Sequence, residues 1–321
     1  MPHGHHGAFE LERIAAALEV EGQLTSGLTS EAIALCADRF ATTGDTVRRV
    51  IDLGCGPGVG TALLAERFES ATVVAVDGSA AMLARAEAIA ARLGVADRVE
   101  TRALDLDGDD LQALGTFDLA WAAMAIHHAR DEVATLTNLR QLLLPHGLVC
   151  VLEREDATIV RLADDLGRPG IWDRLQAARR GRVSPSLPGA SNAERYPAML
   201  AAAGLEVVVS DTLSDTVTAP DDAPTHAFLR AQLRGSLRDL VGVADPADLD
   251  ALRACVEATP VHPDGRWDGA AVTSSRKRFI ARPARSRLPQ ACLGNGDASA
   301  SLPTSLSSAG PSPSPSGTPQ A

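Results

Sequence analysis

A glycine-rich stretch at residues 51–60, IDLGCGPGVG, constrains the fold of this chain more than any other feature of its sequence. An apolar run leads directly into it, and a segment with the apolar spacing of a helix follows. Glycine-rich turns between a strand and a helix are typical of nucleotide-type binding loops. The stretch therefore predicts an α/β protein with a ligand site at this turn.

Strand-like and helix-like segments alternate around this loop and beyond it. Short strands are predicted over residues 47–54, 71–77, 97–105, 116–124 and 147–153. Helix-like segments lie between them, at residues 60–69, 79–94 and 132–145. This alternation is typical of βαβ units, so we expect a doubly wound α/β fold with a parallel sheet and helices on both faces.

The segment before the first strand is predicted to be helical. Apolar residues recur at helical spacing over residues 10–20 and again over residues 29–41. Thr29 or Ser30 is the expected N-cap of the second helix.

The regular alternation ends after the fifth strand. Residues 154–195 are predicted to form loops and one helix, and a strand follows at 205–219. Two more helices, the second capped by Asp245, precede a last strand at 272–283. Residues 284–321 form a tail rich in proline and serine, which predicts disorder.

Composition argues against several classes of protein. The formal net charge of -11 repels a phosphate backbone, which disfavours nucleic acid as a partner. No apolar run reaches the length of about 18 residues that a membrane span needs. The five cysteines form no CxxC pair, so we expect neither a metal site nor a disulfide framework. The N-terminus lacks the basic-then-apolar order of a signal peptide, and we expect a cytoplasmic protein.

The glycine pattern departs from both common phosphate-binding loops. A dinucleotide fingerprint, GxGxxG, requires a third glycine where Val59 or Thr61 stands. A P-loop requires a lysine at its end, and none follows. The loop is therefore expected to hold a ligand without a pyrophosphate.

Acidic residues end the first three strands of the expected sheet. Asp52 stands where a carboxylate opposes a phosphate and attracts an ammonium group. Asp77 ends the second strand, where a carboxylate can accept both hydroxyls of a ribose. Asp105 ends the third strand, within reach of an adenine amino group. The residues indicate a ligand with an ammonium group, a ribose and an adenine.

Five segments together resemble the motifs of class I S-adenosylmethionine-dependent methyltransferases. They read VIDLGCGPGVG, VVAVDGSAAML, TRALDLDG, FDLAWAAMAIHHARD and LLLPHGLVCVLE, and they cover residues 47–153. His146 stands where the family often has glycine. The resemblance implies a Rossmann-like sheet of seven strands, mostly parallel, with an antiparallel final strand.

The same resemblance implies a site for S-adenosylmethionine, with S-adenosylhomocysteine as product and no metal. It places the residues of the cofactor site along the ends of the strands. They are Asp52, Gly54, Cys55, Gly56, Gly58, Asp77, Gly78, Met82, Asp105, Leu106 and Ala122. Residues 1–46 are expected to cover the site, 47–283 to form the methyltransferase domain, and 154–195 to vary the acceptor pocket.

Candidate catalytic residues follow the fourth strand, whose carboxyl end borders the methyl donor. His127 and His128 have the intrinsic pKa of a general base at neutral pH, although such a pair can equally shape the loop. Trp172, Arg174 and Tyr196 are candidates for the acceptor site, and a structural use competes for each.

The basic run on the last strand has a simple interpretation. Arg276, Lys277 and Arg278 are expected to be solvent-facing charges that discourage pairing at a sheet edge.

The sequence thus predicts an enzyme that transfers a methyl group from S-adenosylmethionine to a small molecule by in-line displacement. The chain lacks the [ND]PP[YF] tetrapeptide of amino-methylating nucleic-acid enzymes. Two alternatives stay open. One is a non-catalytic regulatory protein that binds S-adenosylmethionine, and the other is an NAD-dependent oxidoreductase, which the glycine pattern disfavours.

Overall fold

The computed structural model describes residues 4–106, 111–155, 158–180, 193–257, 267 and 269–284, with side chains from residue 11 onward except that of residue 180. The tail predicted to be disordered lies outside the described residues beyond position 284.

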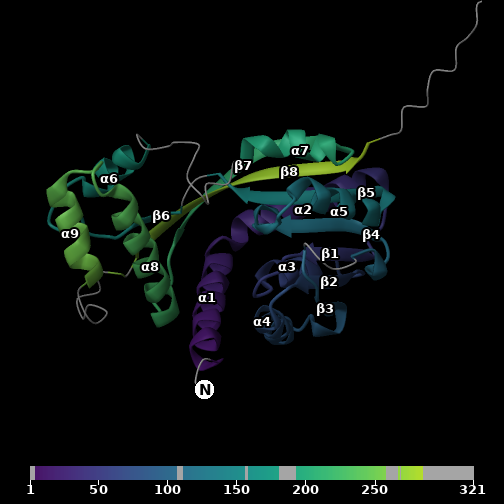
Figure 1. Cartoon of the computed structure of the whole chain (residues 1–321), viewed down its shortest axis with the longest axis horizontal. Helices are drawn as coiled ribbons and strands as arrows, with labels where there is room; N and C mark the ends of the chain where they lie inside the picture. Colours follow the sequence, from purple (N-terminus) through teal and green to yellow (C-terminus); the bar gives the residue numbers. More distant parts are fainter. Residues whose placement is uncertain are drawn as a thin grey trace, which may run out of the picture. The chain divides into compact units, whose positions relative to one another are not determined.

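A single mixed sheet organises the described chain (Figure 1). Its strands are β1 (Arg49–Leu53), β2 (Thr72–Asp77), β3 (Val99–Ala103), β4 (Phe117–Ala123), β5 (Leu143–Arg154), β6 (Ile159–Arg161), β7 (Leu205–Thr218) and β8 (Ala271–Pro283). The order runs β3-β2-β1-β4-β5-β8, and β7 pairs with the other side of β8. Only β8 runs against its neighbours, which confirms the predicted Rossmann-like, mostly parallel sheet with an antiparallel final strand.

The strand count differs from the prediction by one. The short strand β6 pairs with residues 271–273 of β8, beyond the end of β5, inside the segment predicted to hold only loops and one helix. Three residues are too few to display the alternating pattern by which a strand is recognised in sequence.

Helices cover both faces of the sheet, as predicted. They are α1 (Gly4–Leu24), α2 (Ser26–Thr43), α3 (Val59–Arg67), α4 (Ala80–Arg92), α5 (Glu132–Leu142), α6 (Ile171–Arg180), α7 (Tyr196–Ala202), α8 (Ala223–Leu240) and α9 (Pro246–Glu257). Side chains from α2, α3 and α4 pack on one face, and side chains from α5 and α7 on the other. Successive strand residues alternate between these two cores, as the pleat requires.

A third apolar cluster joins α6, α8 and α9 to β6, and the C-terminal half of α1 packs into it through Val20 and Leu24. None of the described helices is long and apolar enough for a membrane crossing.

The helix caps follow the prediction in one case and not in the other. Asp245 caps α9, since its Oδ1 accepts the backbone N–H groups of Ala247 and Asp248 at 2.9 and 3.2 Å. The predicted cap at Thr29 or Ser30 is wrong because α2 begins at Ser26. The N–H of Thr29 donates to the carbonyl of Thr25, so helical hydrogen bonding continues almost directly from α1.

The strand β8 lies inside the sheet, which overturns the expectation for its basic run. Both of its sides are paired, with β5 and β6 on one and β7 on the other. Arg276 and Arg278 are only 4% and 5% exposed, so they are not solvent-facing edge charges. The prediction failed because nothing local in sequence shows which strand ends a sheet.

Candidate active site

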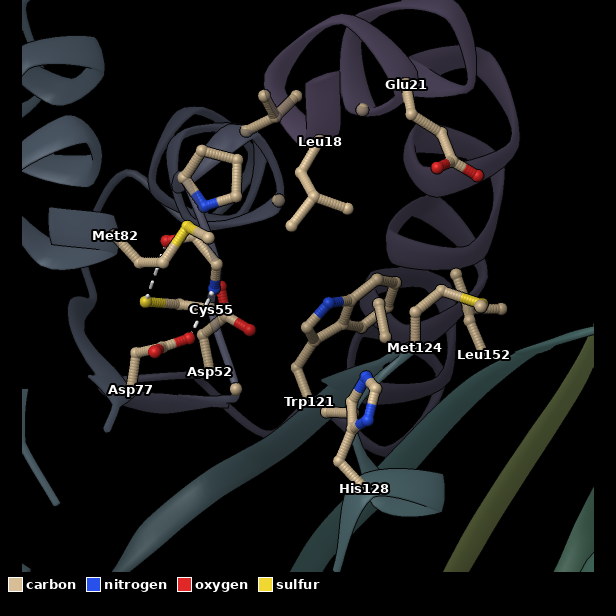
Figure 2. A pocket seen from close by; sticks show the side chains of 18 of the residues that line it. Leu18, Glu21, Asp52, Cys55, Asp77, Met82, Trp121, Met124, His128 and Leu152 are labelled. Atoms are coloured by element: carbon tan, nitrogen blue, oxygen red, sulfur yellow. Dashed lines mark hydrogen bonds between the residues drawn. The ribbon is translucent and has the colours of Figure 1, made fainter. Parts of the chain in front are cut away.

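A cavity of about 580 Å³ opens at the carboxyl ends of β1, β2 and β4 (Figure 2). The glycine loop and the residues after β2 form one wall, and the residues after β4 form another. Helix α1 closes it with Leu11, Leu18 and Glu21. Figure 2 shows Glu21 and Asp77 on different sides of this cavity, with Trp121 and His128 along its floor.

The glycine loop owes its path to three left-handed residues. Gly54, Gly56 and Gly58 have φ values of 68°, 53° and 89°, which residues with a side chain rarely adopt. A Cβ on Gly54 would lie 2.6 Å from that of Ala125, whereas one on Gly56 would meet no atom within 4 Å. The loop therefore turns tightly against the residues after β4 and leaves its backbone near Gly56 open to the cavity.

Asp77 ties the loop to the second strand. Its Oδ2 accepts the N–H of Gly56 at 3.0 Å, and its Oδ1 accepts the N–H of Ser79 at 2.8 Å. Ser79 in turn caps α4 by accepting the N–H of Met82. Each carboxylate oxygen keeps a further lone pair for a donor in the cavity.

Asp52 is a buried carboxyl group at the end of β1. Thr61 Oγ1 donates a hydrogen bond of 2.6 Å to its Oδ2. Burial, and to a smaller extent the neighbouring charge of Asp77, raise the pKa of Asp52 to about 7, although the hydrogen bond from Thr61 acts in the opposite direction. Asp52 is therefore poised to ionise when a cation enters the cavity. The Cys55 thiol beside it stays neutral, because burial and the two carboxylates raise its pKa.

The two candidate catalytic histidines lie in a short turn, Ile126–His128, that follows β4, and both line the cavity. Their ring centroids are 4.1 Å apart. Burial, and then the adjacent His127, lower the pKa of His128.

His127 is held by a carboxylate that the sequence did not reveal. Its Nδ1 lies 2.8 Å from Oε2 of Glu153, a residue with no solvent exposure near the end of β5. The hydroxyl of Tyr196 donates to the other oxygen of Glu153, also at 2.8 Å. With Glu153 as a carboxylate, His127 carries its proton on Nδ1 and leaves Nε2 as a base.

Most of the predicted cofactor residues meet at the cavity. Those that line it are Asp52, Gly54, Cys55, Gly56, Asp77, Gly78, Met82 and Leu106. The structure gives three others different places. Gly58 is the N-cap of α3 and lies close to α4, Ala122 is buried in the core on the other face of the sheet, and Asp105 is exposed outside the cavity wall.

None of the three predicted acceptor residues reaches this cavity. Trp172 packs among α8 and α9, and its Nε1 donates to the carbonyl of Asp164. Arg174 forms an ion pair with Asp248, with Nε and Oδ2 2.7 Å apart. Tyr196 is buried on the opposite face of the sheet, stacked on Phe279. These contacts hold all three side chains away from the cavity.

Several cavity residues were not anticipated as ligand contacts. Met124 has a left-handed φ of 56°, a strained conformation typical of functional turns. Glu21, Arg154 and Arg276 come from three distant parts of the chain and also line the cavity. Within the described residues, no three His, Cys, Asp or Glu side chains gather to hold a metal ion.

Comparison with known proteins identifies the segment that carries the glycine loop. Residues 50–147 match the family model of the methyltransferase domain. This segment is a class I methyltransferase domain.

Two curated proteins that are similar to this chain are trans-aconitate 2-methyltransferases. A trans-aconitate 2-methyltransferase of Deinococcus radiodurans is 39% identical over 104 residues, which are 32% of this chain and 36% of that protein. One from Enterobacter is 36% identical over 149 residues, 45% of this chain and 52% of that protein. The chain thus spans about half or less of the length of these relatives.

One solved structure is similar to this chain at low sequence identity. It is an S-adenosylmethionine-dependent methyltransferase from Thiobacillus denitrificans in complex with S-adenosyl-L-homocysteine. The TM-score is 0.40 at 20% identity, over 77% of this chain and 91% of that one.

Proposed function

We propose that the chain is an S-adenosylmethionine-dependent methyltransferase that acts on a small molecule. One observation carries the proposal: Asp77 presents both carboxylate oxygens beside a glycine loop with an open backbone, in a cavity that also holds buried Asp52. These groups match a ligand with ribose hydroxyls and an ammonium group and without a pyrophosphate.

The cavity fits the donor in size and chemistry. A volume of about 580 Å³ lies within the usual range of roughly 300–1,000 Å³ for ligand pockets. Asp77 would hold the ribose, and Met82 and Leu106 would flank the nucleoside. The open backbone at Gly56 and the carboxyl group of Asp52 would receive the methionine end.

The bound donor supplies an electrophilic methyl group on a positively charged sulfur. The protein's part is to align an acceptor with it and to exclude water, and such positioning can supply about 7–11 kcal/mol. Leu11, Leu18 and Trp121 give the cavity apolar walls for that purpose. We propose that residues 1–46 act as the cover of this site, since α1 and α2 both contribute to its lining.

His127 is the better placed of the two candidate bases. Glu153 fixes its proton on Nδ1, so Nε2 can accept a proton from an acceptor hydroxyl or amine in the cavity. His128, whose pKa is lowered, is neutral at physiological pH and packs against the ring of His127.

The net charge of -11 supports a small-molecule acceptor over a nucleic acid. The four free, buried cysteines of the described chain suit a cytoplasmic protein. Trans-aconitate belongs in the first acceptor screen because curated relatives are methyltransferases of that acid.

Thermal shift assays test the donor assignment. We expect S-adenosylmethionine and S-adenosylhomocysteine to raise the melting temperature and NAD to leave it unchanged, because a ligand stabilises the folded state that binds it. Asp77→Ala should abolish the shift. Stabilisation by NAD alone would instead favour the oxidoreductase. Release of S-adenosylhomocysteine with an acceptor distinguishes an enzyme from a binding protein.

A further inference from the structure

The wall of the cavity on the side of Glu21 carries charges that donor binding does not use. Arg154 at the end of β5 and Arg276 on β8 are directly paired across the two antiparallel strands. Both side chains line the cavity. Their Nη2 atoms lie 2.8 and 3.1 Å from the same oxygen, Oε1 of Glu21 on α1. The wall is therefore a pair of guanidinium groups that converge on one carboxylate oxygen.

Arg276 is an unusual residue to find there. Its side chain is 5% exposed, and burial, followed by the charge of Arg154, lowers its pKa. A buried cation is costly unless it is paired and hydrogen-bonded. Its bonds to described residues, to the Ser275 carbonyl and to Glu21, engage two of its five N–H donors. Arg276 can thus bind a further acceptor oxygen at the cavity wall.

Glu21 shows what kind of group this wall receives. Its carboxylate belongs to α1, the helix that lines the cavity, and it occupies the position between the two guanidinium groups. Guanidinium groups match the planar geometry of carboxylates and bind them through paired hydrogen bonds. The contact of Glu21 is the intramolecular counterpart of a ligand carboxylate at the same place.

We propose that Arg276 and Arg154 form an anchoring site for a carboxylate of the methyl acceptor, which shares or replaces their contact with Glu21. The inference rests on the proposed function, since it assigns the substrate class of the same cavity. A carboxylate suits this wall better than a dianionic phosphate, because Glu21, Asp52 and Asp77 already place negative charge around the cavity.

Calorimetry on the full chain saturated with S-adenosylhomocysteine tests the site. The probes are succinate, citrate and benzoate, their neutral amides, and glycerol 3-phosphate. We expect at least one acid to bind 10-fold or more tightly than its amide. Arg276→Gln should weaken that binding by at least 10-fold and change the affinity for S-adenosylhomocysteine less than twofold. Arg282→Gln, which removes the same charge from an exposed position on β8, is the control.

A second variant separates an anchoring site from a structural ion pair. Glu21→Gln removes the competing carboxylate, so it should tighten binding of the acid severalfold, an effect that a purely structural role does not produce. Glu21→Gln also tests the site on its own if Arg276→Gln fails to fold. Equal binding of acids and amides, tighter binding of glycerol 3-phosphate, or no binding of any acid to protein that binds S-adenosylhomocysteine would overturn the proposal. Acid binding without any binding of S-adenosylhomocysteine would support the anion site and refute the donor site.

Discussion

The imidazole of His127 lies with Nδ1 2.8 Å from Oε2 of Glu153, a carboxylate that solvent does not reach. The pair joins the end of β4 to the neighbouring strand β5, and Tyr196 holds the carboxylate from the far face of the sheet. A histidine fixed in this way has one tautomer and one orientation. Glu153 and Tyr196 are therefore positioning residues, which would act through His127 if it serves as the base in the cavity.

Glu153→Gln should lower kcat by about 10- to 100-fold with an acceptor that needs a base, because the amide no longer enforces the Nδ1 proton. The KM for S-adenosylmethionine should stay unchanged, since Glu153 does not line the cavity. Steady-state release of S-adenosylhomocysteine measures both constants. A loss of donor affinity equal to the loss in kcat would indicate a general structural defect.

Tyr196→Phe removes one of the two hydrogen bonds to Glu153 and leaves the ring stacked on Phe279. We expect a smaller drop in kcat than for Glu153→Gln, together with a shifted pKa in the pH profile of kcat. An unshifted profile with an unchanged kcat would mean that Tyr196 serves only the core.

Asp52 should make the stability of the ligand-free protein fall with rising pH. Its pKa is raised from 3.8 to about 7, so between these values the folded state binds a proton that the unfolded state has lost. The loss of stability amounts to about 1.4 kcal/mol per pH unit inside this window and ends above it. The melting temperatures of wild type and Asp52→Asn should be measured between pH 5 and 8. The wild type should gain stability relative to the variant as the pH falls, because only the wild type takes up the proton on Asp52. Parallel curves would contradict the raised pKa.

Gly58→Ala should destabilise the protein without touching donor binding. A Cβ at this left-handed residue would lie 2.4 Å from Cβ and 2.5 Å from Cα of Ala86 in α4. Strain and overpacking together predict a cost of about 2–5 kcal/mol. Below its melting temperature, the variant should bind S-adenosylhomocysteine as the wild type does. Gly56→Ala is the control for overpacking alone, since it shares the left-handed φ but its Cβ would meet no atom within 4 Å, and it should therefore cost less stability.

The sequence predicted that the glycine loop and Asp77 lie together at one cavity, because that information is local. A glycine loop and an acidic residue at the end of the next strand are brought together by a single βαβ unit, as Gly56 and Asp77 are. One of the three errors in this region, at Ala122, arose from strand parity. Ala122 lies between Trp121 and Ala123, which line the cavity, and it therefore faces the opposite core.

The acceptor side proposed here could not be predicted, because its residues meet only through the order of the sheet. Arg276 lies beside Arg154 because β8 inserts between β5 and β7, and Glu21 reaches both from the first helix. No pattern near any of these residues shows that they share a cavity. Trp172 and Arg174 were attractive by type and position in sequence, yet they support α8 and α9 instead.

Helix α1 is attached to the domain by ion pairs, and weakening them should loosen the cavity. Arg85 on α4 bonds to Glu12 and to Glu19 of α1, the latter with Nη1 and Oε2 2.6 Å apart. The Glu12 side chain is 60% exposed, and Glu19 keeps a second partner in Arg92, so the loss of Arg85 should cost only about 1 kcal/mol of stability. Arg85→Ala should therefore change the melting temperature little, while hydrogen exchange in residues 11–24 and the dissociation rate of S-adenosylhomocysteine both increase. Arg253→Ala, which breaks an exposed pair with Asp250 on α9, should change neither. Faster exchange in α1 without faster ligand release would show that α1 does not retain the donor.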